Sequence, residues 1–169
     1  DKWQIDSIGR FFANKVVKID GKPAYETFVT TEGNQMTAAD SVSTGFYYKQ
    51  LKAPVDTASF ATDTTIYINY VGKLLNGLVF DTNVERVAKD NGLYTPGKAY
   101  GPTKITWGED YSAITMGTDK STVIAGFAKT LWEMKAMEKG VGVFYSNLGY
   151  SYSGSGSSIP GYSPAIAPI

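Results

Sequence analysis

Residues 67–83 read YINYVGKLLNGLVFDTN, and this stretch predicts two antiparallel strands joined by a tight turn. Its first part belongs to a segment, residues 64–71, in which isoleucine and tyrosine recur at every second position. That period is typical of a half-buried strand. Asn76-Gly77 is the strongest short signal for a hairpin turn, and residues 78–80 then form the returning strand.

Residues 123–151 read VIAGFAKTLWEMKAMEKGVGVFYSNLGYS and predict a helix followed by a strand. Apolar residues recur there at intervals of three or four, which favours an amphipathic helix of about three turns. These residues are Ile124, Phe127, Leu131 and Met134. A run of strand-forming residues follows at 141–145, and the chain then enters a stretch rich in Ser and Gly that we expect to be a loop.

Three further elements complete the main part of the chain. Residues 46–51 are rich in strand formers, and residues 111–116 predict another strand. Thr82 and Glu85 have the spacing of a helix capping box, and Gly92 suits the end of that short helix. Strands on both sides of a single central helix predict an antiparallel α+β fold.

The first 43 residues form a separate block. Ile5, Ile8, Phe12 and Val16 have helical spacing, and residues 24–31 suit a short strand. We therefore expect an N-terminal extension at 1–43, partly helical, before a main domain at 44–169.

Composition excludes several kinds of chemistry. The chain has 16 Lys plus Arg and 16 Asp plus Glu without a run of one sign, which argues against a nucleic-acid-binding surface. It has no histidine and no cysteine, so it cannot supply a Ser-His-Asp triad, a thiol nucleophile or a His or Cys metal site. We expect no metal and no cofactor.

The two quoted stretches together resemble the FKBP-type peptidyl-prolyl cis-trans isomerases, the macrolide-binding kind. Residues 67–83 are similar to that family's Tyr-Thr-Gly strand, Asp-Gly hairpin and Phe-Asp-Ser end. Residues 123–151 are similar to its Val-Ile-x-Gly-Trp helix, Met-Lys-x-Gly-Glu-Lys turn and Ala-Tyr-Gly loop. The resemblance covers residues 44–169 and implies a curved antiparallel sheet wrapped around one short helix.

The resemblance also implies a pocket between the sheet and the helix. The residues that it assigns to catalysis are Tyr70, Phe80, Asp81, Ile124, Phe127 and Tyr150. Those that it assigns to substrate contacts are Val123 and Ile159, with Tyr111 as the candidate for an aromatic on the following strand. From the residue pattern alone, without the resemblance, Phe80, Ile124 and Phe127 are interpreted as core residues on a strand and a helix.

The sequence departs from the family pattern at several positions. Phe127 stands where the family has a tryptophan, and Met137 stands where its turn has a glycine. The family usually has a short loop where this chain has residues 82–110, which we interpret as an insertion. Pro164 and Pro168 interrupt the segment in which the family has its last apolar strand, so that strand is either missing or replaced by another segment.

Three functions remain open at this stage. The resemblance implies an isomerase that acts on Xaa-Pro bonds of proline-containing polypeptides, assists folding and binds macrolide inhibitors. The alternatives are a non-catalytic chaperone or protein-binding module with the same fold, and a surface protein whose aromatic loops bind carbohydrate. Abundant Tyr, Thr, Ser and Gly further suggest an exported protein, periplasmic or lipid-anchored at a bacterial cell envelope.

Overall fold

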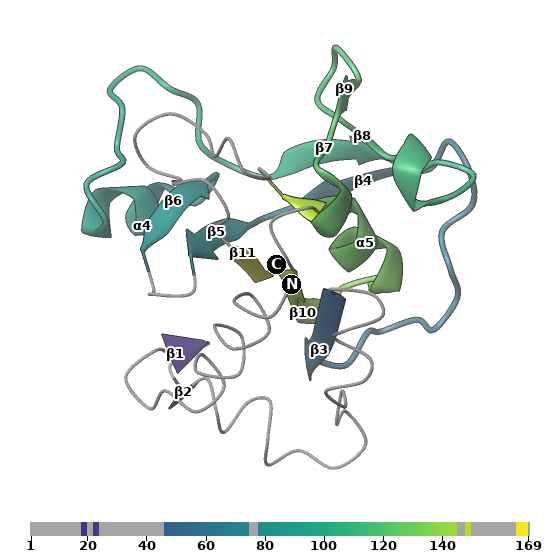
Figure 1. The fold of residues 1–169 in the computed structure, drawn as a ribbon. Coiled ribbons are helices and arrows are strands. Elements are labelled where there is room, and N and C mark those ends of the chain that lie inside the picture. The colour runs from purple at the N-terminus through teal and green to yellow at the C-terminus, as the bar shows by residue number, and fades with distance from the viewer. Residues whose placement is uncertain are drawn as a thin grey trace.

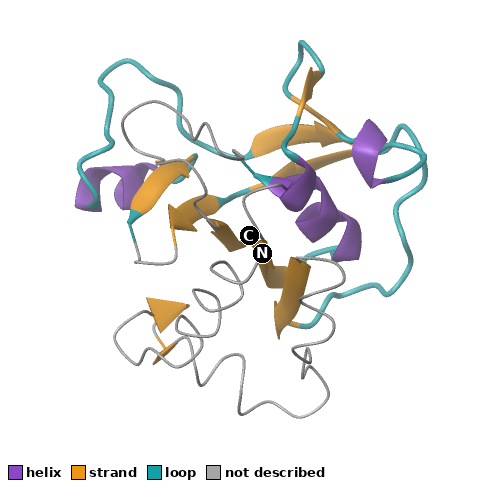
Figure 2. Ribbon diagram, in the orientation of Figure 1, coloured by secondary structure: helices purple, strands orange, loops and turns teal. Residues whose placement is uncertain are grey.

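The computed structural model describes residues 18–19, 22–23, 46–74, 78–144, 148–149 and 165–168. Figure 1 shows their path, and Figure 2 separates helices, strands and loops. The elements in chain order are β1 (Lys18–Ile19), β2 (Lys22–Pro23), β3 (Phe46–Lys52), β4 (Thr65–Ile68), β5 (Val71–Leu74), β6 (Val79–Thr82), α4 (Glu85–Asp90), β7 (Thr103–Thr106), the 3₁₀ turn η1 (Tyr111–Ala113), β8 (Thr115–Met116), β9 (Ser121–Thr122), α5 (Ala125–Glu133), β10 (Lys139–Phe144) and β11 (Ala165–Pro168).

The strands from β3 onwards form two antiparallel sheets. One has five strands in the order β3-β10-β11-β5-β6, and the other has four in the order β4-β7-β8-β9. Helix α5 packs against β10, β3 and η1, and Figure 1 shows it lying across the strands. Antiparallel sheets around this helix confirm the predicted α+β fold.

The predicted strand at residues 64–71 is divided between the two sheets. Residues 65–68 form β4, which pairs with β7, whereas Val71 begins β5, which pairs with β6 and β11. Asn69 and Tyr70 lie between them outside either strand. The even positions stay on the inner side through this break, because Ile68, Gly72 and Leu74 are all buried. The predicted period of two is therefore correct, although the element is two strands.

The prediction for the end of the chain is corrected by β11. Residues 165–168 occupy the centre of the five-stranded sheet, where they pair with β10 on one side and β5 on the other. The two prolines do not prevent this, since Pro164 precedes the strand and Pro168 is its last residue, opposite Val141. The slot of the family's last strand is thus filled by a segment of only four residues.

Helix α4 forms where the sequence predicts it, but its beginning differs. Thr82 is the last residue of β6, and its hydroxyl donates to the Tyr70 carbonyl at 2.7 Å. Val84 is the N-cap residue, and no side chain caps the helix there, so the capping box is not formed. The end is as predicted. Gly92 has a φ of 69°, and the Leu93 amide donates to the Ala88 carbonyl at 2.8 Å, the pattern of a Schellman motif.

Two other sequence predictions have mixed outcomes. Of the predicted strand at 111–116, only residues 115–116 are a strand, because Asp110 accepts a hydrogen bond from the Ser112 amide and thereby caps a 3₁₀ turn at 111–113. Of the first 43 residues, only β1 and β2 are described, and they pair on either side of the Asp20-Gly21 turn signal. The helix predicted around residues 5–16 and the strand predicted at 24–31 lie outside the described residues.

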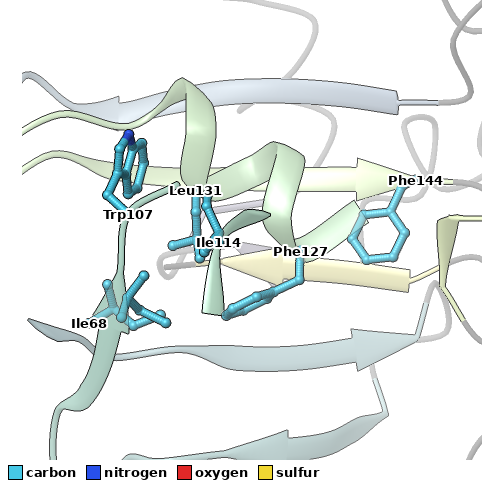
Figure 3. Close-up of a cluster of buried hydrophobic side chains, with 7 residues drawn as sticks. Ile68, Trp107, Ile114, Phe127, Leu131 and Phe144 are labelled. Atoms are coloured by element: carbon cyan, nitrogen blue, oxygen red, sulfur yellow. The ribbon is translucent and has the colours of Figure 1, made fainter. Parts of the chain in front are cut away.

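The core lies between α5 and the strands. Figure 3 shows Ile114, Phe127 and Leu131 gathered at the helix, with Ile68 on β4 and Trp107 nearby. Helix α5 begins after Ile124 and ends before Met134, so the four apolar positions predicted from spacing include its two cap residues. The buried face of this helix is what fixes the position of the cavity described next.

Candidate functional site

A cavity of about 210 Å³ opens between the start of α5 and strands β5 and β6. Its lining is mainly apolar and aromatic, with one carboxylate and two hydroxyl groups. The lining residues are Tyr70, Gly72, Phe80, Asp81, Met116, Thr122, Val123, Ile124, Phe127 and Phe144. This combination of apolar walls and a few polar groups is typical of a site that binds a small organic group or a peptide side chain.

Tyr70 and Asp81 form the polar edge of the cavity. The Tyr70 hydroxyl donates to Asp81 Oδ2 at 2.9 Å, and its ring meets Phe127 edge-on with centroids 5.5 Å apart. Phe127 is 7% exposed and stands at the helix, where it forms the floor. The carboxylate is therefore held beside an aromatic surface by a tyrosine whose own ring is fixed by packing.

Tyr70 is also held through its backbone. Its amide donates to Asn83 Oδ1 at 2.8 Å, and its carbonyl accepts from the Thr82 hydroxyl. The Asn83 side-chain amide in turn donates to the Ile68 carbonyl at 2.8 Å and to Thr103 Oγ1 at 2.9 Å. Asn83 is buried, and it ties the break between β4 and β5 to β7. These bonds fix the direction in which Tyr70 enters the cavity.

Two glycines let aromatic rings approach the backbone closely. A Cβ on Gly72 would lie 2.8 Å from the Phe80 ring, so the ring can lie against β5 only because this residue has no side chain. A Cβ on Gly126 would collide with the Phe144 ring, which packs directly against the first turn of α5. Both rings line the cavity, and both glycines are therefore part of its construction.

The start of α5 borders the cavity through Ile124. Ile124 is the N-cap residue with extended backbone, φ −60° and ψ 145°, and its carbonyl accepts from the Ala128 amide. The first amides of a helix have no partner within it. Within the described part of the chain, no acceptor bonds the Ile124 amide, and Ile124 is one of the residues that line the cavity.

The structure places six of the predicted site residues around this one cavity: Tyr70, Phe80, Asp81, Val123, Ile124 and Phe127. Tyr150 and Ile159 lie outside the described residues. Tyr111 was placed wrongly by the sequence. It belongs to η1 and lies under the Lys129 ammonium, whose Nζ is 5.1 Å from the ring centroid, and it does not line the cavity.

Sequence reasoning missed Met116, Phe144, Gly72 and Thr122 as lining residues. Met116 lies on β8, in the region where the sequence suggested Tyr111. Phe144 lies within the strand predicted at 141–145, and no local signal in the sequence distinguishes it from a core residue. For Gly72, the signal was a glycine inside a strand, which indicates close approach of another group.

Neither a metal-binding cluster nor a membrane-spanning helix occurs in the described part of the chain. Among the described residues, no group of three or more Asp and Glu side chains is placed to hold a metal ion. Within the same part of the chain, none of the helices has the length and apolar character required to cross a bilayer.

Comparison with known proteins supports the fold. No protein-family model matches the sequence, and no curated protein matches it. Among solved structures, the three FKBP domains of wheat FKBP73 match with a TM-score of 0.51 and 19% identity, over 73% of this chain and 44% of that one. The N-terminal domain of FKBP42 from Arabidopsis thaliana matches with a TM-score of 0.48 and 13% identity, over 73% of this chain and 81% of that one.

The strand order, the packing of helix α5 on strands β10 and β3 and the match to wheat FKBP73 define an FKBP-like fold. The chain spans less than half of the wheat structure, which contains three such domains. At 19% identity the likeness is one of fold, and function is argued from the cavity itself.

Proposed function

We propose that this protein is a peptidyl-prolyl cis-trans isomerase that twists Xaa-Pro amides in the cavity at the start of α5. The observation that carries the proposal is the pair of Tyr70 and Asp81, hydrogen-bonded at 2.9 Å, at the edge of an apolar cavity floored by Phe127. A proline ring fits an apolar cavity, and the adjoining amide would lie beside the polar edge.

The chemistry needs no nucleophile, metal or cofactor. The barrier to rotation is amide resonance, about 18–20 kcal/mol for an ordinary peptide bond. A planar amide is more dipolar than a twisted one, so a dry apolar environment raises the free energy of the planar form more. Binding the twisted amide more tightly than the planar one is what accelerates the reaction.

Each residue has a distinct task in this proposal. Phe80, Ile124 and Phe127 supply the apolar surface that surrounds the proline ring. The Ile124 amide donates to a substrate carbonyl. Asp81, oriented by the Tyr70 hydroxyl, lies beside the carbonyl that turns during rotation. Tyr150 is proposed to donate a second hydrogen bond to the substrate.

Proline-containing polypeptides are the substrates in this proposal, and macrolides that bury an apolar ring in the same cavity are candidate inhibitors. The first test is isomerisation of a short Xaa-Pro peptide by the wild-type protein and by Asp81→Ala and Phe127→Ala. We expect catalysis by the wild type and a clear loss in both variants. Wild-type protein that leaves the uncatalysed rate unchanged contradicts the proposal.

A second candidate is a non-catalytic protein-binding module, favoured by the second, larger groove described below. The two candidates differ in one measurement. A binding module retains affinity for unfolded polypeptides while the rate of Xaa-Pro isomerisation stays at its uncatalysed value.

A further inference from the structure

A second apolar groove lies at the other end of α5, between β4 and the beginning of β10. Its volume is about 520 Å³. Its inner side is formed by Ile68, Leu131 and Met134, each less than 10% exposed. Tyr67 and Met137 border it and are 66% and 69% exposed, so two of the largest exposed apolar side chains of the described chain meet at one groove.

The β4 side of this groove is an unpaired strand edge. Strand β4 pairs only with β7 among the described strands. The Trp107 amide donates to the Thr64 carbonyl, so residues 64, 66 and 68 direct their backbone groups towards β7. The alternate residues, including Tyr67 and Asn69, therefore present their backbone N–H and C=O groups to the opposite edge, on which the groove lies.

The register of β11 leads into the same groove. Val141 lies opposite Pro168 in this antiparallel pair. In the same register, Lys139, two residues before Val141, would face the second position after Pro168. On the other side, Lys73 lies opposite Ile166, so Asn69, four residues before Lys73, would face that same position. Lys139 and Asn69 both line the groove. The groove is thus the space that one more extended segment in line with β11 would fill.

The charged residues around the groove indicate which kind of segment can bind there. Lys135 and Lys139 line the groove, and Lys104 lies opposite Tyr67 on β7. The one carboxylate of the lining, Glu138, is engaged within the protein, since it accepts from the Tyr48 hydroxyl, the Gln50 side-chain amide and the Lys135 backbone amide. These donors are neutral, so Glu138 stays negatively charged, and Lys104 together with Lys135 gives the border a small net positive charge, which favours an acidic side chain beside an apolar strand.

The backbone of Met137 is a further observation in this direction. Its φ of 61° is in the left-handed region, which glycine adopts more readily than methionine. Strained residues in a folded protein are often retained for a function. A methionine at this position adds a flexible apolar side chain to the border of the groove, and such a side chain adapts to different partners.

We propose that this groove binds an extended segment of another polypeptide, antiparallel to β4, by adding it as a strand. The segment has alternating apolar side chains and acidic residues at its ends. Main-chain hydrogen bonds to Tyr67 and Asn69 supply affinity, and the apolar side chains enter the space over Leu131 and Met134. This binding does not depend on isomerase activity, because the cavity lies at the opposite end of α5.

The test is amide hydrogen exchange measured by NMR at Tyr67 and Asn69. The probe is an eight-residue peptide of alternating valine and threonine with a glutamate at each end, acetylated and amidated. We expect both amides to exchange rapidly in the free protein and at least about tenfold more slowly with the peptide, because only a bonded amide is protected. The matched control peptide carries N-methyl groups at every second amide and is expected not to bind.

A protein variant provides a second control. Tyr67→Pro removes the edge amide, which β7 does not use, whereas Tyr67→Thr keeps it. We expect the proline variant to lose peptide binding and the threonine variant to retain it. If the proline variant fails to fold, the methylated peptide on wild-type protein still decides the question.

Three outcomes overturn the proposal. Equal binding of the methylated peptide means that the groove takes apolar groups without strand pairing. Protection of Tyr67 and Asn69 in the free monomer means that this chain covers its own edge. Protection that rises with protein concentration, together with a dimer in sedimentation velocity, means that the occupant is a second copy.

Discussion

Tyr70 is fixed at three of its atoms. Its amide donates to Asn83, its carbonyl accepts from Thr82, and its hydroxyl donates to Asp81. Only the third bond reaches the proposed reacting amide. The hydroxyl can therefore be removed while the backbone anchors stay in place, which separates catalysis from folding at the level of one atom.

We predict that Tyr70→Phe lowers kcat/KM for a proline peptide by up to about tenfold, the effect of one lost hydrogen bond near 1.4 kcal/mol. The free energy of unfolding should change by no more than about 1.5 kcal/mol, since both backbone anchors remain. Steady-state kinetics and urea unfolding measure the two quantities. An unchanged kcat/KM would show that the Tyr70–Asp81 bond does not serve the reaction.

Met137 has a backbone conformation that methionine rarely adopts. It has a φ of 61° and is 69% exposed, at the position where the resembling turn has a glycine. The structure explains why glycine suits this position, because the turn requires a left-handed backbone conformation whichever side chain the residue carries.

We predict that Met137→Gly raises the free energy of unfolding by about 0.5–1 kcal/mol. Glycine avoids the left-handed penalty of roughly 1–2 kcal/mol, less its greater entropy in the unfolded chain. Met137→Ala is the matched control, because alanine removes the long side chain but keeps the penalty. Equal stability of the glycine and alanine variants would contradict the backbone explanation.

At the scale of elements, Asn83 connects more of the site than any other polar residue described. It follows β6 and bonds to Ile68 at the end of β4, to Tyr70 before β5 and to Thr103 at the start of β7. It thus joins the two sheets at the point where one predicted strand becomes two.

Asn83→Ala is expected to lower the free energy of unfolding by about 2–4 kcal/mol, because it leaves buried backbone groups without partners. Asn91→Ala is the control. Asn91 is exposed and bonds only the Val87 carbonyl through its side chain, so its loss should cost about 0.5 kcal/mol. Chemical denaturation compares them, and equal effects of the two substitutions would contradict the anchoring role of Asn83.

Strand β3 and the turn before β10 are joined by a tyrosine. The Tyr48 hydroxyl donates to Glu138 Oε2 at 2.8 Å. Burial, and next the hydrogen bond to Glu138, raise the pKa of Tyr48 well above its ordinary value. The neutral tyrosine is thus favoured in the folded state, and its contribution is fully present below the unfolded pKa of about 10 and is lost as pH rises above it.

Tyr48→Phe should therefore reduce the fall in stability above about pH 10, relative to wild type, while lowering stability at neutral pH. The measurement is the free energy of unfolding by urea on both sides of that pH. A fall of the same size in wild type and variant would mean that another group governs alkaline unfolding.

Periodicity and turn signals predicted most elements from the sequence. The helix spacing of Phe127 and Leu131 and the hairpin around residues 76–77 rest on local patterns, and such patterns survive folding. A local pattern does not show which distant segment each strand pairs with. The division at Asn69 and the central position of residues 165–168 depend on hydrogen bonds to distant strands. The 3₁₀ turn at Tyr111 is local, because Asp110 caps it, and the strand-like composition of residues 111–116 does not reveal that cap.

The candidate site likewise contains residues that local motifs predicted and residues that they did not. Tyr70, Phe80, Asp81 and the start of α5 are recognisable because they lie in two continuous motifs. Met116 and Phe144 come from other strands and line the cavity through the packing of β8 and β10. Tyr111 does not line the cavity, because the turn capped by Asp110 places its ring beside the Lys129 ammonium.

At the scale of the whole molecule, α5 carries a different surface at each end. Its first turn, with Ile124 and Phe127, borders the cavity, and its last residues, with Leu131 and Met134, border the groove. One helix thus connects a proposed catalytic site to a proposed strand-binding site. A polypeptide held in the groove would raise the local concentration of its prolines near the cavity.

The most direct measurement of the central claim is two-dimensional exchange NMR on a short Xaa-Pro peptide with a small fraction of wild-type protein. Uncatalysed interconversion takes roughly tens to hundreds of seconds and gives no cross peaks between the cis and trans forms. We predict cross peaks when the protein is added, and their disappearance with Phe127→Ala at equal concentration. Spectra without cross peaks in the presence of folded wild-type protein would contradict the assignment of the cavity as a prolyl isomerase site.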